Sequence, residues 1–162
     1  MDPSTRASLI ERYRSGYAQV AEALAGVSEV ELDARPVDGG WTAREVAHHL
    51  ADSETTSYIR LRRLLAQDRP DIQGYDEAEF ARRLWYDRRV GVSLEVFRTV
   101  RESSAEILER LSEGDWSRGG VHSEIGQFTV ETWLELYAAH AFDHAEQIRR
   151  SRASIERPEA RG

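Results

Sequence analysis

The sequence predicts an all-α protein folded as a single four-helix bundle. Four long segments carry apolar residues at intervals of three and four, several of them begin with helix-capping residues, and no useful length of strand-like alternation occurs. A chain of 162 residues is long enough for one domain with one core and too short for two ordinary domains. We expect this domain to span residues 1–150 and a charged, frayed tail to occupy 151–162.

The first helix is expected over residues 4–25. Leu9, Tyr13, Val20 and Leu24 recur along one face, and Gly26 is placed to end the helix.

The second helix is expected to follow the turn at 38–40. Thr42 and Glu45 have the spacing of a capping box, in which each side chain bonds a free backbone N–H. The apolar face then continues through Val46, Leu50, Leu61 and Leu64, and the helix should end before Arg69 and Pro70.

Two further helices complete the prediction. Residues 71–91 are expected to form a loop with one or two helical turns, and the third long helix should start near Ser93 and end at 112–114. Residues 116–128 are interpreted as another loop, after which the fourth helix begins near Thr129. The four helices are expected to form an antiparallel-type bundle, a fold that builds metal sites from side chains on facing helices.

Composition excludes several classes of function. Arginine and lysine total 22 against 29 acidic residues, for a net charge of −7, so a nucleic-acid partner is not expected. No apolar run is long enough for a membrane span and no secretion signal is evident, so we expect a cytoplasmic protein without a membrane partner. The chain has no cysteine, and any thiol chemistry would need a thiol from outside.

Histidine placement is the most informative functional pattern. His140 and His144 are four residues apart on the fourth predicted helix, so their imidazoles lie one above the other and can aim at one point. A histidine from the second helix would supply a third nitrogen, which is the ligand set of an open metal site.

Only one of His48 and His49 can face that point, because successive residues differ by about 100° around a helix. His49 shares the predicted inner stripe with Val46 and Ser53, whereas His48 is expected to face outward. The alternative interpretation is that all these histidines are polar core or surface residues without a metal.

Several segments resemble one known family. They are residues 39–54, 57–60, 75–77, 121–122 and 136–144, with the sequences GGWTAREVAHHLADSE, SYIR, YDE, VH and LYAAHAFDH. These segments resemble the DinB/YfiT-like family, closest to its bacillithiol S-transferase branch. The resemblance implies a four-helix bundle that holds a divalent metal through His49, His140 and His144. The chain departs from that branch at Glu54 and Gln147, positions where histidine can occur.

The resemblance also implies an activity, namely metal-dependent transfer of a low-molecular-weight, bacillithiol-like thiol to an electrophilic small molecule. Two alternatives stay open: a hydrolase that activates water at the metal, and a non-catalytic, metal-stabilised binding protein. Zinc or nickel is the expected metal, and iron and manganese remain alternatives because three imidazoles accept several first-row ions. A homodimer is expected from the resemblance alone.

Other residues have weaker assignments. Arg60 and Tyr58 are predicted to contact the thiol cosubstrate or a substrate carboxylate, although a surface ion pair or packing would also explain them. His122 lies in a glycine-rich loop that could overhang the site. Four carboxylates are candidates for orienting a ligand histidine or acting as a base: Asp52, Glu54, Asp143 and Glu146. Trp41 and Trp133 are expected in the core.

Overall fold

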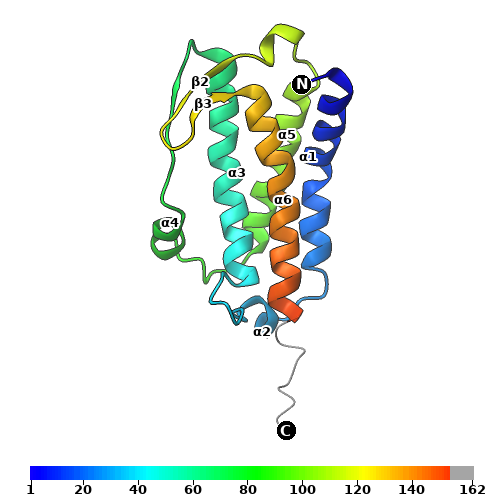
Figure 1. Ribbon diagram of the computed structural model, residues 1–162. Coiled ribbons are helices and arrows are strands. Elements are labelled where there is room, and N and C mark those ends of the chain that lie inside the picture. The colour runs from blue at the N-terminus through cyan, green and yellow to red at the C-terminus, as the bar shows by residue number, and fades with distance from the viewer. Residues whose placement is uncertain (154–162) are drawn as a thin grey trace.

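Four long helices form the body of the protein in the computed structural model, which describes residues 1–153 (Figure 1). They are α1 (Pro3–Ala23), α3 (Ala43–Ala66), α5 (Gly91–Leu108) and α6 (Val130–Ala153). Each packs against two of the others: α1 against α5 and α6, and α3 against the same two helices. The predicted four-helix bundle is confirmed.

The direction of the helices differs from the expected antiparallel arrangement. The colour gradient of Figure 1 shows α1 and α6 running one way and α3 and α5 the other, so that α1 lies parallel to α6 and α3 parallel to α5. The cause is the connection over residues 67–90, which returns along the length of the bundle before α5 begins. Parallel neighbours need such a crossover, and the two shorter connections join antiparallel helices.

The helix starts follow local capping chemistry with one exception. Asp2 accepts hydrogen bonds from the backbone of the first turn of α1, and Thr42 and Glu45 form the predicted capping box of α3. The exception is α5, which begins at Gly91 after Val90, a residue with no side-chain cap. Ser93 is therefore inside α5 and does not cap it. A further capping box precedes the short helix α2 (Glu29–Leu32).

A small three-stranded sheet occupies segments that we expected to be loops. Its strands are β1 (Asp71–Ile72), β2 (Gly119–His122) and β3 (Gly126–Thr129), with β1 parallel to β2 and β2 antiparallel to β3. Strands of two to four residues are too short to show alternation in sequence. A Cβ at Gly120 would lie 2.0 Å from the carbonyl oxygen of Pro70, so close pairing with the chain before β1 requires glycine there.

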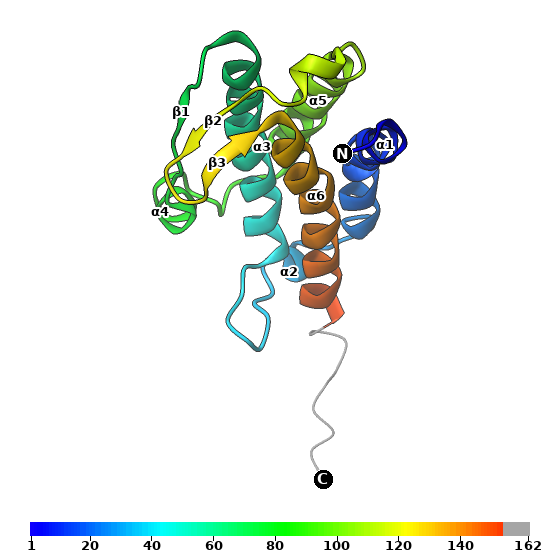
Figure 2. The ribbon, with the colours of Figure 1, turned by 45° about the horizontal axis from the view of Figure 1, so that its top comes forward.

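The sheet and helix α4 (Glu77–Arg83) lie together beside α3, outside the bundle (Figure 2). A single 3₁₀ turn, η1 (Glu113–Asp115), leads from α5 towards the hairpin of β2 and β3. Of these elements, α4 and β2 pack against α3, and β3 packs against α6.

The core consists of two apolar clusters. One includes Leu61, Trp133 and Leu134, and the other includes Val46, Leu50, Phe97 and Ile148. Between them along α3 and α5 lie Glu54 and Arg101, which are 0% and 1% exposed. A polar layer therefore divides the interior of the bundle.

Residues 151–153 continue α6 and do not begin the frayed tail expected at 151. Ser151 is buried and donates a hydrogen bond to the carbonyl of Ala34 (2.9 Å), and Arg152 pairs with Glu31 at 3.1 Å. The rest of the expected tail lies outside the described residues. No helix in the described part of the chain has the length and apolar character needed to cross a membrane.

Candidate metal centre

Three histidines from two helices converge beside the polar layer. His49 comes from the second turn of α3, and His140 and His144 come from consecutive turns of α6. The Nε2 atom of His140 lies 3.4 Å from Nε2 of His49 and 3.1 Å from Nε2 of His144. The structure thus brings together the three residues that the sequence analysis proposed as ligands.

The spacing of these nitrogens fits a shared cation. Two imidazole nitrogens at about 2.05 Å from one tetrahedral zinc ion are about 3.3 Å apart. Hydrogen bonding between the rings would explain only one of these two short contacts, because Nε2 of His140 is shared by both and carries either one proton or one lone pair. Within residues 1–153, the only group of histidine and acidic side chains with metal-ligand geometry is His49, His140 and His144.

All three imidazoles are held in the neutral form that binds metals. Burial, followed by the nearby His144, lowers the pKa of His49 to about 3. Burial is also the main cause that lowers the pKa of His140 and His144. Neutral rings keep the Nε2 lone pairs available at pH 7.

Gln147 orients one of the rings. The Nδ1 atom of His144 donates a hydrogen bond to Oε1 of Gln147 (2.8 Å), three residues further along α6. Because Nδ1 then carries the proton, the lone pair of His144 lies on Nε2, which faces the other two rings. The Nδ1 atoms of His49 and His140 are buried without a hydrogen-bond partner in the described structure, so these rings gain a partner only through Nε2.

Aromatic side chains cover the centre. The Trp41 ring meets the His49 ring edge-on with centroids 4.7 Å apart, and the Tyr137 ring lies 5.8 Å from that of His140. Trp41 also packs on Tyr86. These rings shield the imidazoles from water and lower the local dielectric, which strengthens any charge interaction at the centre.

The prediction for His48 is wrong. His48 is fully buried, with Nδ1 2.8 Å from the Ser93 hydroxyl and Nε2 2.9 Å from the carbonyl oxygen of Arg88. The helical periodicity correctly directed it away from His49. That side of α3 is covered by the segment entering α5, so His48 is a hydrogen-bonded core residue.

Glu54 does not contact the histidines. Its carboxylate accepts a hydrogen bond from Nη1 of Arg101 (2.7 Å) and another from the Tyr13 hydroxyl (2.6 Å). Arg101 also donates through Nε to the carbonyl of Tyr13 at 3.0 Å. We call Tyr13, Glu54 and Arg101 the ionic core cluster. Sequence analysis missed Arg101 because one arginine on an amphipathic helix gives no sign of burial.

Arg60 and Tyr58 lie on different sides of α3. Arg60 is buried, and its guanidinium donates to the Tyr137 hydroxyl (2.9 Å) and to the carbonyl of Gln73 (2.7 Å). The Tyr58 ring instead stacks against Arg62, which reaches the α5 residue Ser103. The structure therefore places Arg60 near the histidines through Tyr137, and Tyr58 on the face towards α5.

The remaining candidates have local roles. His122 is buried in β2 and packs against Phe128 with ring centroids 5.4 Å apart, so it does not overhang the site as an exposed loop residue. Asp52 accepts a hydrogen bond from the Tyr86 hydroxyl (2.7 Å). Asp143 and Glu146 are exposed on α6 and form no hydrogen bond to a ligand ring.

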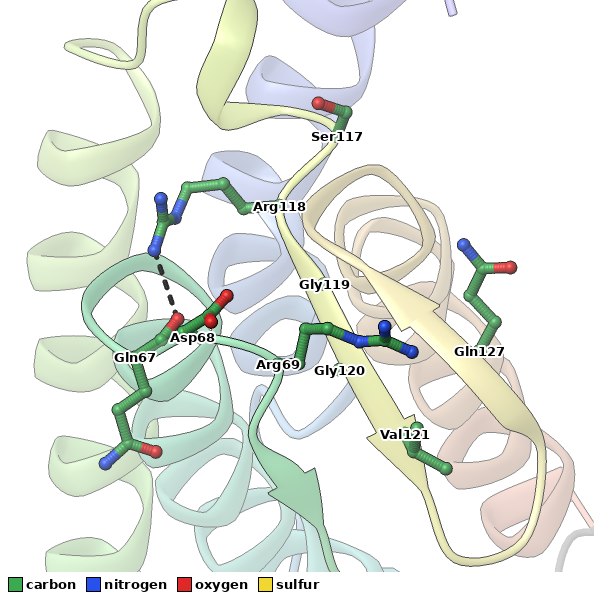
Figure 3. Close-up of a pocket in the computed structure, with 9 residues that line it drawn as sticks. All are labelled: Gln67, Asp68, Arg69, Ser117, Arg118, Gly119, Gly120, Val121 and Gln127. Atoms are coloured by element: carbon green, nitrogen blue, oxygen red, sulfur yellow. Dashed lines mark hydrogen bonds between the residues drawn. The ribbon is translucent and has the colours of Figure 1, made fainter.

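A surface cavity of about 560 Å³ lies at the opposite end of α3 (Figure 3). It is lined by Gln67, Arg69, Arg118 and neighbouring residues of β2 and β3. Arg118 donates to the carbonyl oxygens of Leu64 and Gln67 and so caps the end of α3. None of the predicted ligands lines this cavity, so its size does not make it the functional site.

The fold and the site define a four-helix bundle with a three-histidine centre of metal-binding geometry. Residues 12–148 match the DinB superfamily, and the chain belongs to that family.

Named relatives agree with this assignment. The chain is 35% identical over 118 residues to a protein of Oceanobacillus iheyensis named "Putative metal-dependent hydrolase", covering 73% of this chain and 69% of the relative. It is 31% identical over 138 residues to the Bacillus subtilis protein "Putative metal-dependent hydrolase YfiT", covering 81% and 75%. The solved structure of YfiT, described as having an unusual four-helix bundle topology, superposes with a TM-score of 0.90 at 27% identity over 98% of this chain and 91% of YfiT.

Proposed function

We propose that the protein is a metal-dependent enzyme whose divalent cation is held by His49, His140 and His144. The observation that carries this proposal is the convergence of three neutral imidazole nitrogens, from buried His49 and half-buried His140 and His144, at separations of 3.1 and 3.4 Å. A divalent cation with three imidazole ligands and one exchangeable position lowers the pKa of a bound water or thiol, which supplies a charged nucleophile near neutral pH. The substrate is an electrophilic small molecule.

Hydrolysis is the first candidate reaction. The names of the Oceanobacillus iheyensis and Bacillus subtilis relatives support it. The chain contributes three neutral ligands, so the full positive charge of the cation is retained at the centre. Gln147 orients His144 through a neutral amide, which preserves that charge better than a carboxylate partner would.

Transfer of a low-molecular-weight thiol, such as bacillithiol, is the second candidate. It is favoured by the surroundings of the rings: within the described structure the group of converging ligand atoms includes no Asp or Glu oxygen that could act as a base on a bound water. A thiol, with an ordinary pKa of about 8.5, needs much less assistance than water to become a nucleophile. The chain has no cysteine that could compete for the electrophile.

The proposal is tested with untagged protein loaded with zinc, nickel or cobalt. Metal content should be about one ion per chain in the wild type and fall to background in His140→Ala and His144→Ala. His122→Ala, a histidine outside the centre, should retain the ion. Equal metal content in the wild type and the two α6 variants would overturn the proposed site.

Activity then separates the two reactions. The loaded wild type is incubated with ester, amide and alkyl halide substrates, each with and without added bacillithiol, cysteine or glutathione. Metal-dependent turnover without thiol supports hydrolysis, and turnover that requires a thiol and yields its conjugate supports transfer. Full metal occupancy with neither reaction across the panel would favour the non-catalytic, metal-stabilised binding protein.

A further inference from the structure

One buried arginine lacks the partner that the others have. In residues 1–153, four arginines are buried: Arg6, Arg44, Arg60 and Arg101, with exposures of 7%, 5%, 9% and 1%. Arg6 pairs with Glu113 and Glu131, Arg44 with Glu29 and Asp33, and Arg101 with Glu54. No ion pair of the described structure includes Arg60, whose acceptors are the neutral Tyr137 hydroxyl and Gln73 carbonyl.

Two unpartnered polar atoms lie at this arginine. Arg60 Nε is buried without a hydrogen-bond partner, and so is the hydroxyl of Tyr75. The Arg60 guanidinium carbon lies 6.0 Å from the centre of the Tyr75 ring. Burying a guanidinium that has no hydrogen-bonded carboxylate, together with polar atoms that lack a hydrogen-bond partner, destabilises a fold, so their retention indicates a ligand that supplies the missing acceptors.

Arg60 and the Tyr75 hydroxyl lie close to the three-histidine centre. Tyr137, which accepts the Arg60 hydrogen bond, precedes His140 by one turn of α6. On α3, Ser53 follows His49 by one turn and adjoins the Tyr75 hydroxyl. Arg60 also lines a surface groove of about 330 Å³, together with Thr56, Ile59, Arg63 and Gln73.

We propose that Arg60, together with the Tyr75 hydroxyl, binds a carboxylate of the small molecule that reacts at the three-histidine centre. Arg60 offers Nε and a neighbouring Nη in the planar arrangement that matches the two oxygens of a carboxylate. Tyr75 remains protonated because burial raises its pKa, so its hydroxyl is a donor at neutral pH. This inference rests on the proposed metal-dependent function and specifies that its substrate or cosubstrate is acidic.

Glu77 is the residue of the chain whose carboxylate could pair with Arg60 in place of a substrate carboxylate. Burial and the nearby Glu124 raise the pKa of Glu77, whereas Arg60 lowers it, but no ion pair joins Glu77 to Arg60. If Glu77 were the true partner of Arg60, replacing Glu77 would open the subsite and strengthen binding of acidic ligands. If the subsite accepts ligands without displacing Glu77, Glu77→Gln leaves their affinity within about twofold.

The test uses metal-chelating probes that do not depend on turnover. Cobalt-loaded protein is titrated with monohydroxamates of dicarboxylic acids that have two, three or four methylene groups, and with their methyl esters. Binding is followed by the visible spectrum of cobalt. We expect at least one acid to bind about 10- to 100-fold more tightly than its ester, since hydrogen bonds to a charged group are the strong ones.

Variants assign the preference to these residues. Arg60→Met should remove the preference for the acid and leave ester affinity unchanged, while Tyr75→Phe should weaken acid binding about 3- to 10-fold. Arg62→Met, a half-buried arginine of the same helix that contacts Ser103 of α5 and does not line the groove, is the matched control and should keep the wild-type preference. Circular dichroism of the metal-loaded variants checks that each is folded, and Arg60→Lys replaces Arg60→Met if the latter is not.

Equal affinity of acid and ester at every length, or binding of the esters without binding of any acid, would overturn the carboxylate subsite. A preference that survives in Arg60→Met would overturn it as well. Failure of the proposed function has different outcomes: either cobalt is not held by the three histidines and neither acid nor ester binds, or the acid preference is present while neither hydrolysis nor thiol transfer occurs.

Discussion

The ionic core cluster and the three-histidine centre are two groups of buried polar side chains on the same helices, and they differ in how their partners are supplied. In the ionic core cluster, the Glu54 carboxylate, the Arg101 guanidinium and the Tyr13 hydroxyl satisfy one another at 2.6 and 2.7 Å. In the histidine centre, His49 and His140 have unpartnered Nδ1 atoms and three Nε2 atoms face each other. A closed network of this kind serves stability, and an incomplete one indicates a ligand.

The largest expected effect is a loss of stability when the ionic core cluster is broken. Glu54→Ala should destabilise the protein by about 3–5 kcal/mol, because it leaves the Arg101 guanidinium buried without a carboxylate. Urea unfolding of the metal-free protein measures this loss. The double variant Glu54→Leu with Arg101→Met should recover most of it, and a loss below about 1 kcal/mol in the single variant would show that the cluster is not a closed network.

Metal withdrawal tests the incomplete network. When free metal is about a thousandfold above its Kd, a chelator should lower the free energy of unfolding of the wild type by about 4 kcal/mol, since only the folded chain brings the three imidazoles together. Unfolding in urea with and without chelator gives the difference. In His144→Ala the chelator should have almost no effect, and an equal drop there would place the stabilising ion elsewhere.

Gly16 lies where α1 packs against Arg101 of the ionic core cluster and against Ala141, the neighbour of His140 on α6. A Cβ at this position would lie 2.7 Å from the Cβ of Ala141 and 2.7 Å from Nη2 of Arg101, so Gly16→Ala should destabilise the protein by about 1–3 kcal/mol. Gly91→Ala, where a Cβ meets nothing within 4 Å, is the control and should be neutral or stabilising by up to about 1 kcal/mol. Thermal unfolding of both variants measures the contrast, and similar midpoints would refute it.

The smallest expected effect is on metal affinity, through the orientation of the His144 ring. Gln147→Ala should weaken metal binding about 10- to 100-fold without abolishing it, because His144 keeps its position but loses the acceptor that fixes its tautomer. Competition with a chelator of known affinity measures the change. Glu146→Ala, an exposed neighbour on α6, should leave the affinity unaltered. Loss of all metal in Gln147→Ala would instead mean that Gln147 is itself a ligand.

Sequence reasoning predicted the parts of the molecule that depend on helical periodicity. The helices, the cap at Thr42, the shared face of His140 and His144, and the preference for His49 over His48 follow from three- and four-residue spacing along α3 and α6. The complete set of three ligands was implied by the family resemblance, and the structure brings these residues together. Spacing along one helix fixes which side chains share a face. It does not say what lies against each face, which is why His48 was expected outside although the start of α5 buries it.

Features that depend on distant pairings were not predicted. The strands β1, β2 and β3 are held by each other and by the close approach of Gly120 to Pro70, not by any local alternation. Glu54 and Arg101 are 47 positions apart, and each resembles an ordinary exposed charge in sequence. The direction of α5 depends on how the connection over 67–90 runs through space, and length alone does not determine this.

The separation of the histidines along the chain has a consequence for how the protein is made. His49 and His140 are 91 positions apart, and both α6 ligands belong to the last element of the described chain. During synthesis α3 leaves the ribosome long before α6, so the nascent polypeptide offers a cation a single imidazole of the three. Metal loading must therefore follow the arrival of α6, and scarcity of the ion would affect finished molecules and not the early stages of their folding.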